Sequence, residues 1–236
     1  MEMENMTTQF RIEKDSLGEV QVPCDALYGV QTVRATQNFP ITHLRTHPAM
    51  IRSLGMIKKA CAMANHECGH LDDERTGYII AACDEIIQGK LDCWFITDVI
   101  QGGAGTSTNM NANEVVANRA AQLAGKALGV YDYIHPNDHV NFGQSTNDVF
   151  PTAGKLTALF LVEDLLEELM LLQEALLDKS IEFNDVIKLG RTHLQDAVPI
   201  RMGQEFHAFA TAIVRDIRRI KVAFSNLKSV NMGATA

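Results

Sequence analysis

One long apolar segment in the second half of the chain limits the possible folds more than any other feature. Its apolar residues recur at helical spacing for about seven turns and cover much of the helix circumference. A single neighbouring helix could not cover so much apolar surface, so the segment predicts a helical bundle, and we expect an oligomer. The residues that define the segment are Leu156, Leu159, Phe160, Val162, Leu165, Leu166, Leu169, Met170, Leu172, Leu176 and Leu177.

The rest of the chain predicts further helices after an irregular start. Short strands are expected at 10–13, 19–23 and 26–30, where glycines and prolines separate runs of strand-forming residues. Helices are expected at about 48–69, 72–89, 114–124 and 204–226. The predicted fold class is therefore mainly α. A mixed N-terminal domain of short strands and helices would occupy residues 1–140, and the first part of a long-helix bundle would occupy 141–236.

Composition excludes several classes of protein. The formal charge is -8, and an acidic chain without a stripe of basic residues does not favour nucleic acid as a partner. The densest basic group, Arg215 to Lys221, lies on a helical pattern, where a solvated or subunit-facing side explains it. The first residues lack the basic region and apolar core that are typical of a secretory signal, and no uncharged apolar stretch reaches membrane-spanning length. Five cysteines at irregular spacing predict reduced thiols and a cytoplasmic location.

A run of hydrogen-bond donors precedes the apolar segment. It extends from His135 to Asp148, and Ser145, Thr146 and Asn147 lie near its end. These are helix-capping residue types, and a helix N-terminus with free backbone N–H groups is also an anion site. The sequence leaves both interpretations open, because the same residue types dominate caps and turns.

A second run, Gln101 to Asn111, combines three glycines with a hydroxyl cluster that includes Thr106. It lacks the spacing of a dinucleotide-binding loop and the Gly-Lys-Ser/Thr ending of a phosphate loop. A simple glycine-rich connector and a loop whose amides approach a ligand both remain possible.

A third polar run, Lys188 to Pro199, is expected to form a loop that contains Thr192 and His193. His193 is either a satisfied loop histidine or a group that titrates near neutral pH and acts in the chemistry.

A zinc site at His66, Cys68 and His70 is not expected, although the residue types suit the metal. Gly69 would interrupt the helix that has to hold both imidazoles, and no second cluster of ligands completes such a site.

Together the three polar runs resemble the aspartase/fumarase superfamily, and the resemblance extends from about Arg11 to the last residue. Within it the chain is more similar to the aspartate ammonia-lyases than to the fumarases. Fumarases typically have Gly-Ser-Gly-Thr-Gln where this chain has Ala104 and Ser107, and usually Ser-Ser-Asn where it has Thr146.

The resemblance implies a lyase that converts L-aspartate reversibly to fumarate and ammonia by abstracting a proton from Cβ. It implies a homotetramer whose active sites combine segments of three subunits, with no metal and no organic cofactor. It also implies that the proton-abstracting serine lies beyond residue 236, so that residues 1–236 alone would have little or no activity.

By the same resemblance, two groups of residues would bind anions. A carboxylate beside a carbon that loses its proton gains negative charge, so it needs preorganised donors. Those expected at this carboxylate are Thr106, Ser145 and Thr146, with Asn147, Thr192 and His193 near the amino group and the other carboxylate. We favour an orienting role for His193. A possible second anion site would contain His135, Asn137 and Asp138.

Two other functions compete with this one. The first is hydration of fumarate to malate, which related enzymes catalyse. The second is a non-catalytic helical oligomerising fragment that lacks the base.

Overall fold

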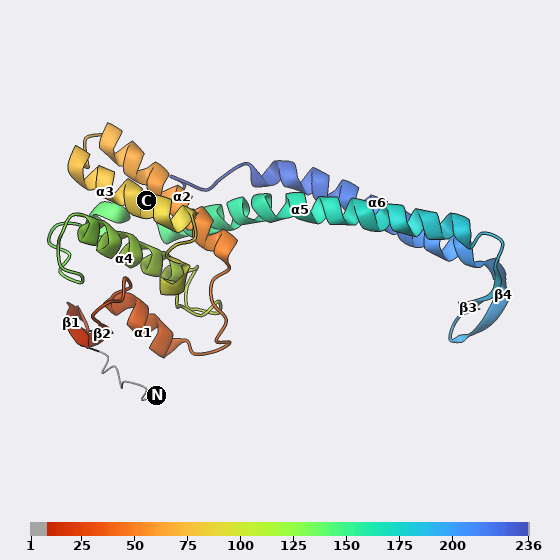
Figure 1. Ribbon diagram of the computed structural model, residues 1–236, viewed down its shortest axis with the longest axis horizontal. Coiled ribbons are helices and arrows are strands. Elements are labelled where there is room, and N and C mark those ends of the chain that lie inside the picture. The colour runs from red at the N-terminus through yellow and green to blue at the C-terminus, as the bar shows by residue number, and fades with distance from the viewer. Residues whose placement is uncertain (1–8, 236) are drawn as a thin grey trace, which may run out of the picture. The chain divides into compact units, whose positions relative to one another are not determined.

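The computed structural model describes residues 9–235, and it confirms the mainly α fold class (Figure 1). The elements in order are β1 (Phe10–Asp15), β2 (Gly18–Pro23), α1 (Val30–Asn38), α2 (Pro48–Glu67), α3 (Asp73–Ile87), η1 (Asp92–Trp94), α4 (Thr106–Leu123), η2 (Pro136–Val140), α5 (Thr146–Glu182), β3 (Ile187–Thr192), β4 (Gln195–Arg201) and α6 (Met202–Leu227). The four strands form two separate antiparallel pairs, β1 with β2 and β3 with β4.

The chain divides into two compact units. The first contains the residues up to Thr157 together with those from Val230 onward, and the second contains Ala158–Ser229. The predicted domain boundary between residues 140 and 141 stays a prediction.

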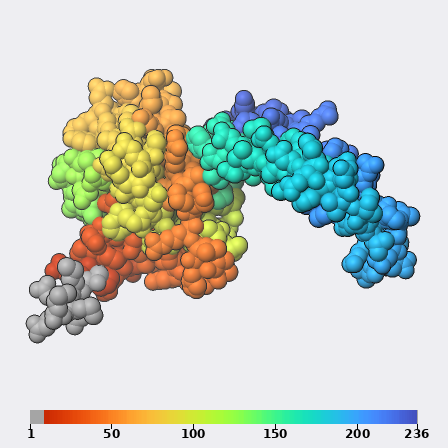
Figure 2. Space-filling view, turned by 45° about the vertical axis from the view of Figure 1, so that its right-hand side comes forward, coloured from red at the N-terminus to blue at the C-terminus, as the bar shows by residue number. Residues whose placement is uncertain are grey.

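Helices α2, α3 and α4 provide the core of the first unit. They lie side by side in the ribbon view, and the orange to yellow segments that hold α2 and α3 pack against each other in the space-filling view (Figures 1 and 2). On α2 and α3 the core side chains recur every three or four residues, as the sequence predicts. Fully buried side chains of the three helices include Leu54, Ile79, Ile86, Val115 and Val116.

Helix α4 is buried on all sides although it carries many polar residues. Asn111 accepts a hydrogen bond from the backbone N–H of Ile96 at 3.0 Å and donates to the carbonyl of Trp94 at 3.0 Å. Asn118 accepts from the backbone N–H of Gly129 at 2.8 Å. Because a buried amide without a partner is unfavourable, these contacts fix the loops around α4.

Glu114 of α4 explains a helix that the sequence did not predict. Its carboxylate accepts hydrogen bonds from the backbone N–H groups of Gly29 (2.8 Å), Gln31 (2.8 Å) and Thr32 (3.1 Å), and from the Thr32 hydroxyl (2.6 Å). These are the free donors at the N-terminus of α1. The strand expected at 26–30 was therefore wrong: α1 begins at Val30, capped by a carboxylate 85 positions from Gly29.

Helices α2 and α3 begin and end close to where the sequence places them. Asp72 caps α3 by accepting from the backbone N–H of Arg75 at 2.8 Å, as predicted from the residue type. Helix α4 differs, because it begins at Thr106 and not near Glu114. The hydroxyl cluster therefore lies on the first helical turn and not in a loop.

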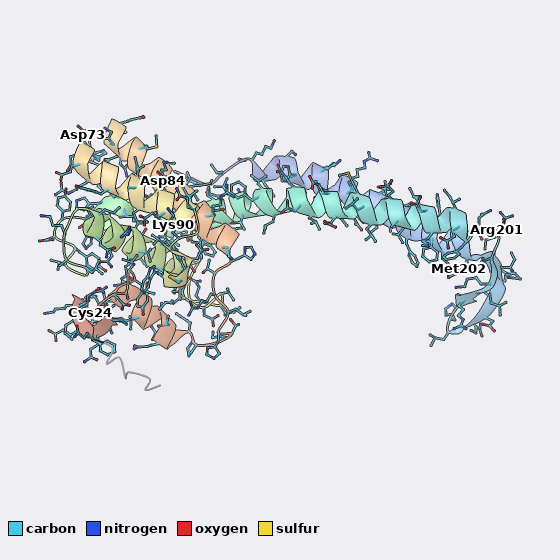
Figure 3. The ribbon with its side chains drawn as sticks, in the orientation of Figure 1. Cys24, Asp73, Asp84, Lys90, Arg201 and Met202 are labelled. Atoms are coloured by element: carbon cyan, nitrogen blue, oxygen red, sulfur yellow. The ribbon has the colours of Figure 1, made fainter. Side chains whose placement is uncertain are left out.

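The second unit consists of the later part of α5, the β3–β4 hairpin and α6. Helices α5 and α6 lie alongside each other, and Arg201 and Met202 mark the junction of β4 with α6 (Figures 1 and 3). The loop expected from Lys188 to Pro199 was wrong, because these residues form an antiparallel hairpin in which Thr192 pairs with Gln195.

Few side chains of the second unit are buried. In α6 only Gly203, Ala210 and Ile217 are buried among the residues that the structure describes. Large apolar side chains stay exposed on both helices: Leu161, Leu165, Met170, Leu171, Leu172 and Ile181 on α5, and Phe209, Val214 and Val222 on α6. Within residues 9–235, no helix combines the length and apolar character that a membrane crossing requires.

Candidate functional site

Two helix N-termini meet in the first unit. Helix α4 begins at Thr106 after Gly105, and α5 begins at Thr146 after Ser145. The side-chain Nδ2 of Asn109, on the first turn of α4, donates to the hydroxyl of Thr146 at 3.0 Å. The structure therefore brings two of the three predicted polar runs together, with the positive ends of both helix dipoles.

A hollow of about 400 Å³ lies between these runs. Its polar wall comes from the glycine-rich loop and from Asn147, and its apolar wall from side chains before α4 and on α5. The lining residues are Val99, Ile100, Gln101, Gly103, Ala104, Gly105, Asn147, Phe150 and Pro151. The predicted hydroxyl donors Thr106, Ser145 and Thr146 do not line this hollow themselves, although Gly105 and Asn147 beside them do.

The hydroxyls at the start of α5 already accept hydrogen bonds from the protein. The Oγ of Ser145 accepts from the backbone N–H of Asn147 at 3.2 Å, which confirms Ser145 as a helix cap. The hydroxyl of Thr146 accepts from Asn109. Each hydroxyl therefore keeps its own hydrogen for a further acceptor.

The side chain of Gln101 links the two ends of the glycine-rich loop. The Oε1 of Gln101 accepts from the backbone N–H of Thr108 at 2.8 Å, and its Nε2 donates to the Thr108 hydroxyl at 2.6 Å. This pair of hydrogen bonds fixes the conformation of the loop between residues 101 and 108.

Gly105 is required where the two runs touch. Its φ is +86°, and a Cβ atom there would lie 2.2 Å from Cγ of Phe150. Only glycine combines the left-handed backbone with this close approach to the aromatic ring.

The residues of the possible second anion site lie together on η2. The ring Nδ1 of His135 accepts from the backbone N–H groups of Asn137 (3.2 Å) and Asp138 (3.1 Å). That nitrogen then carries no proton, so the Asp138 carboxylate 3.2 Å away does not form an ion pair with it. His135 and Asn137 line a hollow of about 220 Å³ with Lys14, Gln31 and Tyr131.

Thr192 and His193 belong to the second unit. His193 and Leu194 are the two central residues of the β3–β4 turn, and both have positive φ, 47° and 61°. Such a two-residue turn normally contains Asn and Gly, so the backbone of these residues is strained. The side chains of Thr192 and His193 are exposed, and Leu194 is fully exposed at 106%.

Sequence reasoning missed a buried lysine that contacts the polar run before α5. Lys58 of α2 is 0% exposed, and its Nζ donates to Oδ1 of Asn141 at 2.7 Å and Oε1 of Gln144 at 2.9 Å. Burial lowers the pKa of Lys58 to about 7. Asn109 was missed too, although asparagine inside a helix is a usable signal, since it is unfavourable there without a partner.

The imidazoles of His66 and His70 contact other groups of the first unit. The Nδ1 of His66 contacts the carbonyl of Leu71 at 3.1 Å, and its Nε2 lies 3.2 Å from the Asp73 carboxylate. The His70 ring packs against Phe142. These contacts direct the two imidazoles to different neighbours.

Comparison with known proteins gives the family. Residues 18–236 match the lyase family. The chain belongs to this family of lyases. An aspartate ammonia-lyase of Bacillus sp. is 58% identical over 231 residues, which are 98% of this chain and 49% of that lyase. A class II fumarate hydratase of Halobacterium salinarum is 50% identical, over 98% of this chain and 49% of its own length.

A solved lyase structure agrees with the fold. The crystal structure of a fumarate lyase:delta crystallin from Brucella melitensis matches with a TM-score of 0.88 and 49% identity, over 96% of this chain and 53% of that chain. The chain spans about half the length of the curated lyases that it matches.

The contact between Gly105 and Phe150 gives a first prediction. Gly105→Ala should lower the free energy of unfolding by about 2 kcal/mol or more, because it adds left-handed strain to a steric clash. Gly77→Ala in α3 is the control, since nothing lies within 4 Å of its added Cβ atom. Chemical denaturation of both variants measures the difference, and equal stabilities would contradict the proposed need for glycine at position 105.

Lys58 gives a prediction about pH. The folded state holds the pKa near 7 and the unfolded state returns it to 10.5, so between these values the unfolded state binds more protons and stability rises with pH. The free energy of unfolding should rise by at most about 1.4 kcal/mol per pH unit. Above about pH 8.5 the thiols of the unfolded chain ionise and oppose the rise, because burial keeps Cys83 protonated in the fold by raising its pKa to about 12.

Urea unfolding at about pH 7 and about pH 8.5 tests this prediction. Lys58→Met should remove the rise, whereas Lys59→Met should keep it, because Lys59 is partly exposed and pairs with Asp84 at 2.7 Å. A rise that persists in the Lys58→Met variant would assign it to another group.

Proposed function

We propose that the protein containing this chain eliminates ammonia from L-aspartate and gives fumarate, in a reversible reaction. The observation that carries the proposal is the meeting of two helix N-termini whose hydroxyls keep their hydrogens for an anion. The 58% identity to an aspartate ammonia-lyase supports the choice of substrate.

The chemistry requires such donors. Loss of the Cβ proton places a second negative charge on the neighbouring carboxylate, and preorganised donors stabilise that charge more than they stabilise the substrate. Thr106, Ser145 and Thr146 would bind this carboxylate. Hydroxyls suit the role because they donate without placing a fixed negative charge beside a dicarboxylate.

The other predicted residues complete the proposal. Asn147, Thr192 and His193 would bind the amino group and the second carboxylate, with His193 orienting the leaving ammonia. His135, Asn137 and Asp138 would form an ancillary anion site. The elimination itself needs no metal and no organic cofactor.

We also propose that the protein is a homotetramer in which subunits share active sites. Two features of the second unit support this. Its helices leave large apolar side chains exposed, and its hairpin exposes His193 on a strained turn that no contact within the described chain explains. The five free cysteines support a reducing cytoplasmic location.

Hydration of fumarate to malate is the second candidate, because a class II fumarate hydratase is 50% identical to the chain. The two reactions share the dicarboxylate and differ in the group that leaves. A non-catalytic helical scaffold is the third candidate.

Turnover by the full-length protein distinguishes these three functions. We expect fumarate, followed by its ultraviolet absorbance, to form from L-aspartate much faster than from L-malate. Ser145→Ala should lower kcat/KM for L-aspartate roughly 100-fold, as loss of an oxyanion donor does. Ser16→Ala, an exposed serine in the β1–β2 turn, should have no effect.

Each alternative outcome points to a different function. Faster turnover of L-malate would favour the hydratase, and turnover of neither substrate would favour the scaffold.

The exposed faces of α5 and α6 predict the state of assembly. Light scattering should give a mass of four chains for the full-length protein. Leu171→Glu should dissociate it, because Leu171 is 59% exposed on α5 and a buried charge at a subunit interface is strongly unfavourable. Leu17→Glu is the control, as Leu17 is 77% exposed in a turn of the other unit. A monomeric wild-type protein would contradict the proposal.

A further inference from the structure

We propose that the buried side chains of Lys58 and Asn109, together with the partly buried Asn141, orient the hydroxyl of Thr146 so that its hydrogen is directed to the bound carboxylate. The inference rests on the proposed function, since it assigns positioning residues to the same anion site. None of the three is proposed to touch the substrate.

The chain of contacts starts from Lys58, which donates to the side-chain amides of Asn141 and Gln144. Its Nζ lies 2.7 Å from Oδ1 of Asn141 and 2.9 Å from Oε1 of Gln144. No carboxylate accepts from it among the contacts that the structure describes. Because an amide oxygen accepts and never donates, the lysine fixes which end of each amide faces it.

Two backbone carbonyls fix the same orientation independently. The Nδ2 of Asn141 donates to the carbonyl of Gln144 at 3.1 Å, and the Nε2 of Gln144 donates to the carbonyl of Val140 at 2.9 Å. A carbonyl offers no hydrogen, so exchanging the ends of either amide would lose bonds at both ends. The orientation of Asn141 therefore does not depend on the protonation state of Lys58.

Asn141 in turn fixes Asn109. Its Oδ1 lies 3.3 Å from Nδ2 of Asn109, which is only 1% exposed. The same Nδ2 donates to the hydroxyl of Thr146 at 3.0 Å. Both hydrogens of this amide are used, and its Oδ1 has no partner in the part of the chain that the structure describes.

The consequence falls on Thr146. A hydroxyl that accepts from a fixed amide keeps its single hydrogen for another acceptor. At the N-terminus of α5 that acceptor would be the carboxylate that gains charge in the reaction. If the Asn109 amide were reversed, its Oδ1 would face Thr146, and the Thr146 hydroxyl would donate its hydrogen to that oxygen. Lys58 and the two backbone carbonyls thus act together on the direction of a donor that none of them touches.

A double-mutant cycle in the full-length protein tests the inference. The variants are Asn109→Ala, Thr146→Val and the double variant, and the measured quantity is the inhibition constant of succinate, a four-carbon dicarboxylate without a leaving group. Each single substitution should raise the inhibition constant of succinate roughly 10- to 100-fold, as loss of a hydrogen bond to a charged group does. The double variant should be no weaker than Thr146→Val, because Asn109 acts only through that hydroxyl.

Asn113→Ala is the matched control. Asn113 is also a buried asparagine of α4, but its Nδ2 faces the sulfur of Met110 at 3.5 Å. It should leave the succinate inhibition constant unchanged, alone or with Thr146→Val. If Asn109→Ala does not fold, Asn109→Asp keeps the shape and replaces the donor with an acceptor. Asn109→Asp alone should weaken succinate binding, and it should have a smaller effect when Thr146→Val is also present.

The outcomes separate this inference from the proposed function. Additive effects of Asn109→Ala and Thr146→Val in a protein that turns over L-aspartate would overturn the inference and leave the function intact. If the wild type turns over neither L-aspartate nor L-malate, the proposed function fails. The thermal unfolding midpoints of the same four proteins without ligand then decide: coupling between the two positions supports the chain of contacts, and additivity overturns it.

Discussion

The burial of a polar helix is the constraint on which the first unit depends. Helix α4 has Asn109, Asn111, Glu114 and Asn118 on faces that other elements cover. Each buried polar group must find a partner or destabilise the fold by about 1–3 kcal/mol. The partners are backbone groups and side chains of loops distant in sequence, so the same contacts that satisfy α4 also fix those loops.

The candidate site is one product of this constraint. The Nδ2 of Asn109 on α4 donates to the hydroxyl of Thr146, and this contact joins the start of α4 to the first turn of α5. Two helix N-termini then face the same hollow, which neither run of sequence specifies alone. In the inference that we propose, the contacts of Asn109 and Asn141 would determine that the Thr146 hydroxyl accepts from the protein and donates to the ligand.

Local patterns predicted the elements whose causes are local. The apolar period gave α2, α3, α5 and α6, and the residue types at 145–147 gave the cap of α5. Helix α1 was missed because Glu114 caps it from a distant position, and no window around residue 30 contains that carboxylate. The β3–β4 hairpin was missed because its turn contains His193 and Leu194, which do not resemble the usual Asn-Gly turn. Lys58 was missed because one lysine in an apolar period does not stand out, and its partners lie in a loop more than eighty positions away.

The two units treat their polar residues in opposite ways, and this contrast bears on the proposed function. In the first unit one candidate donor, Thr146, accepts a hydrogen bond from the buried amide of Asn109. In the second unit Thr192 and His193 are exposed on a turn whose positive φ values cost about 1–3 kcal/mol each, and no packing within that unit offsets the strain. A strained and exposed turn persists when contacts outside it stabilise it. In the homotetramer that we propose, those contacts would come from other subunits, which would also cover the apolar faces of α5 and α6. The same assembly would then provide the missing packing and complete the active site.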